Sequence, residues 1–377
     1  MKRNHALVVS VSLFALAINL LAPLITTFST YFQLNEHYFS FIYLFQYGSF
    51  FLCSHLLAAY YKKYRKIPKY ILKTALMMTS FAVFLIGYCI TFWQLAIVFI
   101  FIGGLGGIIE SGATALLSEN DCSGGKSIYL SQFFYASGAF FAPFLLAVFL
   151  RITLPLRWIS LLVASGTAII TIIVFRYKES DKVFQETENI SDERLLQKNN
   201  NSSLIHLSGT MVLYVILEGS LFAWFPYYLE TAFSYTPSKA AGMFSLFTVG
   251  FAIIRFIYFL MPAHKYAVFL VLHSLSIVLS LICLNMFTSI CLQVIFLLLL
   301  GIGCGPIWPL IVNYCSHNSL DLHHVIYVVG AGSLGALLGP SLTSFIVHSI
   351  GIIDMVDVLL FYGIILLILN LILSKRN

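Results

Sequence analysis

The stretch GGLGGIIESGATALLSEN, residues 103–120, is an apolar run that carries a carboxyl group. Four glycines occupy the first five positions, Glu110 follows them, and the next charge comes only at Glu119. Runs of about 18 or more mostly apolar residues recur throughout the chain, and each can cross a hydrocarbon core of ~30 Å as a helix. The pattern predicts a bundle of membrane-spanning helices, one of which holds an acid in its interior.

The composition supports the same class of protein. Hydrophobic residues make up 60% of the 377 residues, charged residues only 10%, and the mean hydropathy is +0.93. A soluble domain carries roughly a quarter charged residues, so this chain cannot cover a soluble surface. A membrane β-barrel would show short alternating segments instead of long apolar runs. We therefore expect an all-α integral membrane protein.

Twelve spans are predicted, and the first is interpreted as a retained helix because no cleavage site follows Lys2 and Arg3. Their approximate limits are 6–28, 38–61, 68–90, 93–117, 128–150, 155–176, 207–230, 238–260, 265–284, 287–314, 322–348 and 352–373.

Lysine and arginine set the orientation, since they are enriched in cytoplasmic loops. With the N-terminus inside, eighteen of the 21 basic residues fall on the cytoplasmic side, and only Arg151, Arg157 and Lys239 fall outside. The bias predicts both termini in the cytoplasm and a multi-pass protein of the cytoplasmic membrane. The net charge of +6 is then a topology signal, and we expect no nucleic-acid partner.

The chain divides into two halves. A charged, Asn-rich stretch predicts a cytoplasmic linker at 177–206, between six-helix bundles at 1–176 and 207–377. GAFFAPF from Gly138 matches GALLGPS from Gly335 at an offset of 197, and GGLGG from Gly103 matches GIGCG from Gly301 at 198. LFQYG, ending at Gly48, also matches LFTVG at an offset of 202. Parallel repeats of six helices resemble the major facilitator architecture, in which substrate lies between the halves.

Three charged side chains lie inside predicted spans: Glu110, Glu218 and, nearer the cytoplasmic end, Arg255. A charge near the centre of a span costs ~2.5–3.5 kcal/mol, which favours a functional role. A carboxyl group in an apolar surround can exchange a proton as a cavity opens to either side, and that is the chemistry of proton-coupled transport. The alternative is a neutral acid that hydrogen-bonds to a neighbouring helix for structure.

Weaker candidates for contact with solute are polar and aromatic residues within spans. Amides pair with hydroxyl-rich ligands and aromatic faces stack on sugar rings, but each residue can equally serve packing or interhelical hydrogen bonding. Trp308 holds the repeat position of Glu110, so the acid is expected in one half only. These candidates are Asn19, Gln46, Gln132, Tyr135, Trp224, Trp308 and Asn313.

Enzyme signatures are missing from the sequence. It contains no GxxxxGK[ST], HExxH or GxSxG, and its seven cysteines form no CxxC pair. We therefore expect no catalytic activity, cofactor or metal site, and an ion gradient as the energy source.

The motifs together resemble the fucose permease branch of the major facilitator superfamily, the fucose–galactose–glucose:proton symporters. The resemblance rests on GLGGIIESGAT, LSQFFYASGAFFAP, YVILEGSLFAWFPYYL, TVGFAIIR and GIGCGPIWP. It implies that Glu110 is the proton-linked carboxylate and that Arg255 is a gating residue, which pairs with neighbouring loops at the cytoplasmic end of its span. Where the family often has Asn-Asp in the first span, this chain has Asn19-Leu20.

The expected function is secondary transport of a small polar solute, with a sugar as one candidate, by alternating access and with protons. The protein is expected to act as a monomer in the lipid bilayer. One alternative is an exporter of amphipathic compounds, with Glu218 or Glu110 facing cations. Another is a membrane sensor or scaffold that transports nothing.

Overall fold

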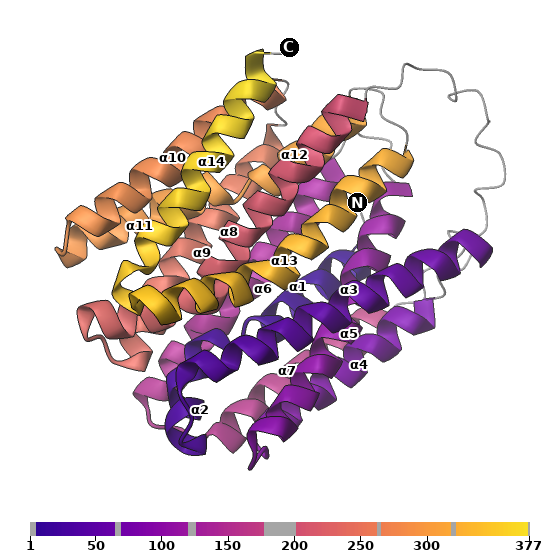
Figure 1. Cartoon of the computed structure of the whole chain (residues 1–377). Helices are drawn as coiled ribbons and strands as arrows, with labels where there is room; N and C mark the ends of the chain where they lie inside the picture. Colours follow the sequence, from indigo (N-terminus) through magenta and orange to yellow (C-terminus); the bar gives the residue numbers. More distant parts are fainter. Residues whose placement is uncertain are drawn as a thin grey trace.

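A computed structural model describes residues 5–64, 69–119, 126–176, 201–261, 265–317 and 322–375. These residues form helices and short connections, without a strand in the described ranges (Figure 1). The elements are α1 (His5–Ile18), η1 (Ala22–Leu24), α2 (Ile25–Phe32), η2 (Glu36–Tyr38), α3 (Phe39–Tyr64), α4 (Lys69–Ile86), α5 (Phe92–Glu119), α6 (Lys126–Arg151), α7 (Leu156–Arg176), α8 (Asn201–Phe233), α9 (Pro237–Leu260), α10 (Tyr266–Met286), α11 (Ile290–Cys304), α12 (Ile307–His317), α13 (Leu322–Ile350), η5 (Ile352–Asp354) and α14 (Met355–Lys375).

The helices account for all twelve predicted spans. Ten helical segments of the described chain are long and apolar enough to cross a membrane, Tyr70–Ile86 is a shorter apolar helix, and α3 has 26 residues. The first span is divided into α1, η1 and α2, and the tenth into α11 and α12. The predicted all-α class and the twelve-helix arrangement are therefore confirmed. Helix α8 starts at Asn201, ahead of its predicted start at 207, and most of the proposed linker lies outside the described residues.

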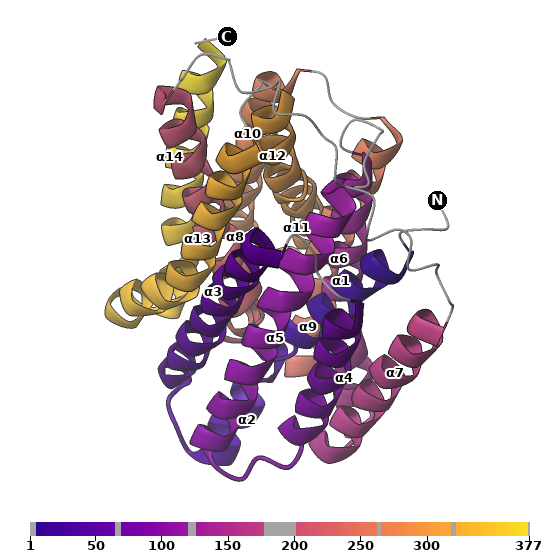
Figure 2. The same ribbon diagram turned by 90° about the vertical axis from the view of Figure 1, so that its right-hand side faces the viewer.

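The three basic residues that the sequence assigns to the outside lie toward one end of the bundle. The start of α1, the end of α7, the start of α8 and the end of α14 lie toward the other end, here called the inner end (Figure 2). The opposite end is called the outer end. It contains the end of α6 with Arg151, the start of α7 with Arg157 and the start of α9 with Lys239.

Glycines bring two pairs of helices into backbone contact. A Cβ placed on Gly103 of α5 would overlap the Gln46 carbonyl oxygen of α3, and one on Gly107 would overlap that of Phe50. In the second half, a Cβ on Gly301 of α11 would overlap the Phe247 carbonyl oxygen of α9. Without a hydrophobic force between helices in lipid, such close approach supplies the packing energy.

These contacts fix the register of the repeat. Gly103 and Gly107 pack on Gln46 and Phe50, and their counterparts Gly301 and Gly305 pack on the backbone of Phe247 and Phe251. The glycines thus keep the predicted offset of 198. The residues of α3 and α9 that they contact differ in number by 201. This offset is one residue smaller than the 202 given by matching Gly48 with Gly250. Contact geometry is the stricter guide here, because glycine alone is common in membrane helices.

A second pair of contacts repeats in the same way. A Cβ on Gly138 of α6 would overlap the Ser12 carbonyl oxygen of α1, and one on Gly335 of α13 would lie 2.5 Å from that of Val212 in α8. The offset of 197 predicted for these glycines therefore describes equivalent packing in the two halves.

Proline divides the tenth span. Because proline has no amide hydrogen, Pro306 and Pro309 remove the donors that the carbonyls of Ile302 and Gly305 would otherwise receive in a continuous helix. Side chains from other helices replace these donors. Arg255 donates to Gly305, and His273 hydrogen-bonds to the Ile302 backbone. The break is thus held by neighbouring helices.

Substituting the packing glycines with alanine tests this architecture. We expect Gly103→Ala and Gly301→Ala each to lower the free energy of unfolding in detergent by about 1–3 kcal/mol, because the added methyl group meets backbone atoms. Gly166 has no atom within 4 Å of an added Cβ, so Gly166→Ala is the matched control and should be neutral or stabilising by up to about 1 kcal/mol. Equal effects at all three positions would contradict the proposed packing role.

Candidate substrate and coupling site

The interior of the bundle holds a buried guanidinium group. Arg255 of α9 is only 1% exposed. Its Nε donates to the Gly305 carbonyl at 2.6 Å, and its Nη1 donates to the Gln132 carbonyl of α6 at 3.0 Å. Its guanidinium carbon lies 3.9 Å from the centre of the Phe251 ring. Among the described residues, Arg255 thus pairs inside the bundle with two backbone carbonyls and an acid. The expected pairing with cytoplasmic loops is not seen there, and the gating role stays a prediction.

That acid is Glu218. Its Oε1 lies 3.7 Å from Nη2 of Arg255, and 14% of its side chain remains accessible. Tyr214, one turn earlier on α8, lies beside Glu218 and donates its hydroxyl hydrogen to the Cys304 carbonyl at 2.8 Å. Tyr214 was missed in the sequence, although residues four apart share a helix face. Acid, arginine and tyrosine thus converge on the break between α11 and α12.

Glu110 lies close to this pair without joining it. The carboxyl group interacts electrostatically with Glu218 and Arg255. Within the described part of the chain, it has neither a hydrogen bond nor an ion pair. If all three groups were ionised, their charges would sum to one excess negative charge. Among the residues that the structure describes, Glu110 is therefore the acid of this cluster without a partner.

Two tyrosines of the first half border the same cluster. Tyr135 of α6 lies 5.9 Å, ring centre to guanidinium carbon, from Arg255, and it interacts electrostatically with Glu110. Tyr47 of α3 interacts electrostatically with both Glu110 and Glu218. Tyr135 was among the sequence candidates, whereas Tyr47 was not, because nothing in its local pattern separates it from the many other aromatic residues.

Asn19 and Gln46 donate hydrogen bonds to backbone carbonyls near the break between α1 and η1 in the first span. Asn19 donates its amide to the Ala15 carbonyl at 2.7 Å, where α1 ends, and Gln46 donates to the Ile18 carbonyl at 3.3 Å. Both side chains are buried. The Gln46 Oε1 atom is buried without a hydrogen-bond partner. The observed contacts of Asn19 are structural, and Gln46 keeps one free acceptor.

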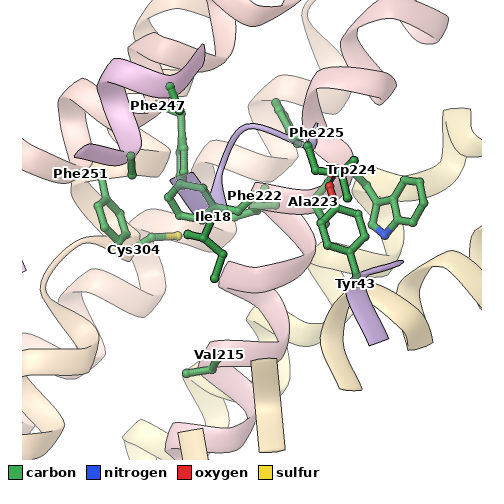
Figure 3. Packing of buried hydrophobic residues seen from close by; sticks show 14 of the residues in the cluster. Ile18, Tyr43, Val215, Phe222, Ala223, Trp224, Phe225, Phe247, Phe251 and Cys304 are labelled. Carbon is green, nitrogen blue, oxygen red and sulfur yellow. Dashed lines mark hydrogen bonds between the residues drawn. The ribbon is translucent and has the colours of Figure 1, made fainter. Parts of the chain in front are cut away.

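Trp224 lies toward the outer end, between the halves. Its indole nitrogen donates to the Pro340 carbonyl of α13 at 2.8 Å, and its ring packs against that of Tyr43 from α3, with ring centroids 5.7 Å apart and planes inclined by 67°. The Tyr43 hydroxyl donates to the Ala223 carbonyl at 3.1 Å, and Figure 3 shows these residues together. These contacts join the two halves near the outer end, so Trp224 is observed in helix packing that closes this end.

Two of the remaining sequence candidates, Gln132 and Asn313, lie where the halves meet. The backbone of Gln132 accepts from Arg255, and its side chain is buried. Asn313 of α12 lies beside Tyr129 of α6, and its Nδ2 atom is buried without a hydrogen-bond partner. Trp308 is half-buried near the start of α12.

The two halves carry different chemistry on equivalent positions. Arg255 donates to Gly305, and Ser54, 201 residues earlier, donates to Gly107 at 3.3 Å. The contact is the same, but only one half has the charge. Likewise Trp308 stands where the first half has Glu110. The charged cluster is therefore an addition to the repeat and not a product of it.

The described residues contain no group of three or more His, Cys, Asp or Glu that could hold a metal ion. Their six cysteines are free. The cluster itself consists of two carboxyl groups, a guanidinium group and tyrosine hydroxyls, which can exchange protons, form ion pairs and hydrogen-bond.

Sequence comparison places this arrangement in a known family. The model of the Major Facilitator Superfamily matches residues 7–324. The chain belongs to the Major Facilitator Superfamily. It is also similar to a "Protein TsgA homolog" from Buchnera aphidicola subsp. Baizongia pistaciae (strain Bp), at 24% identity over 273 residues, which covers 70% of this chain and 68% of the relative. The superfamily predicted from the motifs is therefore confirmed.

Solved structures share the fold. The human organic anion transporter MFSD10 (TETRAN) has a TM-score of 0.71 at 14% identity, covering 98% of this chain and 99% of its own. A bacterial homolog of the human lysosomal transporter Spinster, in an inward-facing and unoccupied conformation, has a TM-score of 0.72 at 11% identity, covering 98% and 96%. At such identities the likeness shows the fold alone.

Family membership makes this chain a secondary transporter and a multi-pass membrane protein, not an enzyme. Its members bind small-molecule solutes within a lipid membrane. Because the chain belongs to a family of transporters, the alternative of a sensor or scaffold that transports nothing is not supported.

A double-mutant cycle tests the buried pair. We expect Arg255→Met to lower the unfolding free energy by about 3–5 kcal/mol, because it leaves Glu218 and the Gly305 carbonyl without a partner. Adding Glu218→Gln should recover part of that loss, since the uncompensated acid is then removed. Unfolding in detergent, followed by circular dichroism, measures both. Strictly additive losses from the two substitutions would show that the groups do not interact.

Proposed function

We propose that this transporter moves a small polar solute across the cytoplasmic membrane together with protons, by alternating access. Glu110 is the proposed proton-binding group, and Glu218 with Arg255 is the proposed link between protonation and movement of the halves. A sugar is one candidate solute. The protein is proposed to work as a monomer, because each chain contains both halves of the site.

The excess carboxyl group carries this proposal. Glu218 already has Arg255 as a counter-ion, whereas Glu110 has none among the described residues. A lone carboxylate within a span costs several kcal/mol, and binding a proton removes that cost. A group that is stable only when neutral, beside a pair that is stable when charged, can load and release a proton as access to water changes.

Arg255 offers a route from protonation to motion. The guanidinium belongs to the second half, yet it donates to the Gln132 carbonyl in the first half. It also spans to Glu218 and to the break after α11. Protonation of Glu110 would remove a negative charge that interacts with the guanidinium, and this change would act on a contact between the halves. This is the proposed gating role of Arg255.

The lining of the cluster supports a polar solute with an apolar face. Tyr47 and Tyr135 offer rings and hydroxyl groups, and Gln46 and Asn313 each hold a buried polar atom without a partner. Free amide groups of this kind suit hydroxyl-bearing ligands. Trp308 is a further proposed contact, on the side of α12.

Export of amphipathic cations is the second candidate function. The same excess carboxylate would attract a positively charged amine, and the surrounding tyrosine rings favour cations electrostatically. In that case, the proton and the solute would compete for Glu110 and move in opposite directions. One protein of the same fold, human MFSD10, is an organic anion transporter, but a cluster with one arginine and two acids is a poor match for an anion.

Transport in proteoliposomes tests the proposal. Solutes from a panel of sugars and amphipathic cations are added outside vesicles in weakly buffered medium, and external pH is recorded. For symport we expect a substrate-dependent rise in external pH, because protons enter with the solute. Glu110→Gln should abolish the pH change.

The control is Asp354→Asn, because Asp354 is exposed at the outer end and belongs to no proposed site. It should transport as the unmodified protein does. If Glu110→Gln still moves protons with substrate at the normal ratio, the role given to Glu110 is wrong. A fall in external pH upon uptake of a cation would instead favour exchange.

A further inference from the structure

Two histidines from opposite halves meet at the outer end of the bundle. His37 lies in η2, before α3, and His348 lies near the end of α13. Their rings are stacked, with centroids 4.4 Å apart and planes inclined by 20°. The Nδ1 atom of His37 also forms a 2.9 Å hydrogen bond with the Ser344 hydroxyl of α13. A pair of titratable rings thus lies on the seam that must open for solute to enter from outside.

The stability of the stacked rings depends on their protonation state. Two neutral imidazoles attract one another as flat aromatic rings, whereas two protonated rings at this distance repel. Partial burial and the nearby His348 lower the pKa of His37 below its usual value. The closed arrangement therefore favours the neutral rings.

Neighbouring acids do not offset that repulsion. In the described part of the chain, neither imidazole forms an ion pair with a carboxylate within 4.0 Å. Glu36, on the same short helix, accepts a 2.9 Å hydrogen bond from Ser29 Oγ and bonds to Tyr227 of α8. Glu230 of α8 interacts with Glu36.

The other titratable groups around the stack are engaged elsewhere or lie outside it. The Tyr43 hydroxyl of α3 donates to Ala223, and the Asp357 carboxylate of α14 accepts from Asn285 at 2.8 Å. Tyr31 of α2, Tyr38 of η2 and Asp354 of η5 are exposed. Excess positive charge on the rings would therefore have no ion-pair partner within reach among the residues that the structure describes.

We propose that His37 and His348 form a proton-sensitive latch, which holds the outer ends of α3 and α13 together when the rings are neutral and releases them when they are protonated. The latch extends the proposed function, since it would let acid on the outer side open the pathway to that side. The sign follows from linkage. In the open state His37 returns toward the ordinary histidine pKa of about 6.5 from its lowered value in the closed state, so falling pH through that value favours opening.

The contacts around the latch make it a local device. Tyr43 and Trp224 close the same seam deeper in the bundle through pH-insensitive groups. At the surface, the ring stack and the bond to Ser344 join η2 to α13. Protonation would thus act first on the outermost layer of the closure.

Distance measurement by double electron–electron resonance tests the latch without substrate. Spin labels are placed at Tyr31→Cys on α2 and Ser349→Cys on α13, both exposed, after replacement of the seven native cysteines. In nanodiscs, we expect the distance distribution to shift toward longer values as pH falls from about 8 to about 5, a range that brackets the ordinary histidine pKa. His37→Gln with His348→Gln should remove this pH dependence.

Two further variants complete the test. His37→Lys with His348→Lys should give the longer distances even at the alkaline end of the range, because the charge is then permanent. His55→Gln is the matched control, since His55 is exposed on α3 and bonds to its own helix at Phe51. A distance that ignores pH, or a pH response that survives loss of both rings, would overturn the proposal. Either result leaves the proton-coupling role of Glu110 untouched, because no transport is measured.

Discussion

The arrangement of the interior depends on one constraint: a guanidinium group with almost no access to water needs polar partners and a counter-charge from the protein. Arg255 is buried among four helical segments, and an uncompensated charge there would cost several kcal/mol. Its partners are therefore specific. Pro309 leaves the Gly305 carbonyl without a backbone donor, Gln132 offers a carbonyl from the other half, and Glu218 supplies the counter-charge. The proline break, the acid and the contact between halves form one unit.

Glycine makes that unit possible by bringing the helices close. Gly301 and Gly305 place α11 directly against the backbone of α9, so Arg255 can reach the break. The equivalent contacts in the first half bring Ser54 to Gly107 with the same geometry and no charge. The repeat therefore provides a neutral scaffold in duplicate. Function has been added to it asymmetrically, with one acid in the first half and an ion pair in the second.

The sequence predicted the scaffold well, because its signals are local or periodic. Span lengths, glycine clusters and the bias of basic residues each follow from the bilayer itself. The three interior charges were also recognised, since charge within an apolar run is costly. The partners of those charges were not, because they depend on helix rotation and contact. Arg255 was assigned to loops by its position near a helix end, and Tyr47 was not distinguished from the many aromatic residues around it.

Dependence on tertiary contact also explains why the sequence does not single out His37 and His348 as functional candidates. His37 lies in a short connection and His348 near the end of a span, and only the packing of α13 against η2 brings them together. Their proposed role is nevertheless consistent with the interior. Glu110 can accept a proton from outside only if the outer seam opens, and a latch released by protons opens it when protons are abundant. The inner cluster would then bind the proton that the latch has admitted. A transporter driven by an inward proton gradient gains from this order, because solute and proton meet the site from the same side.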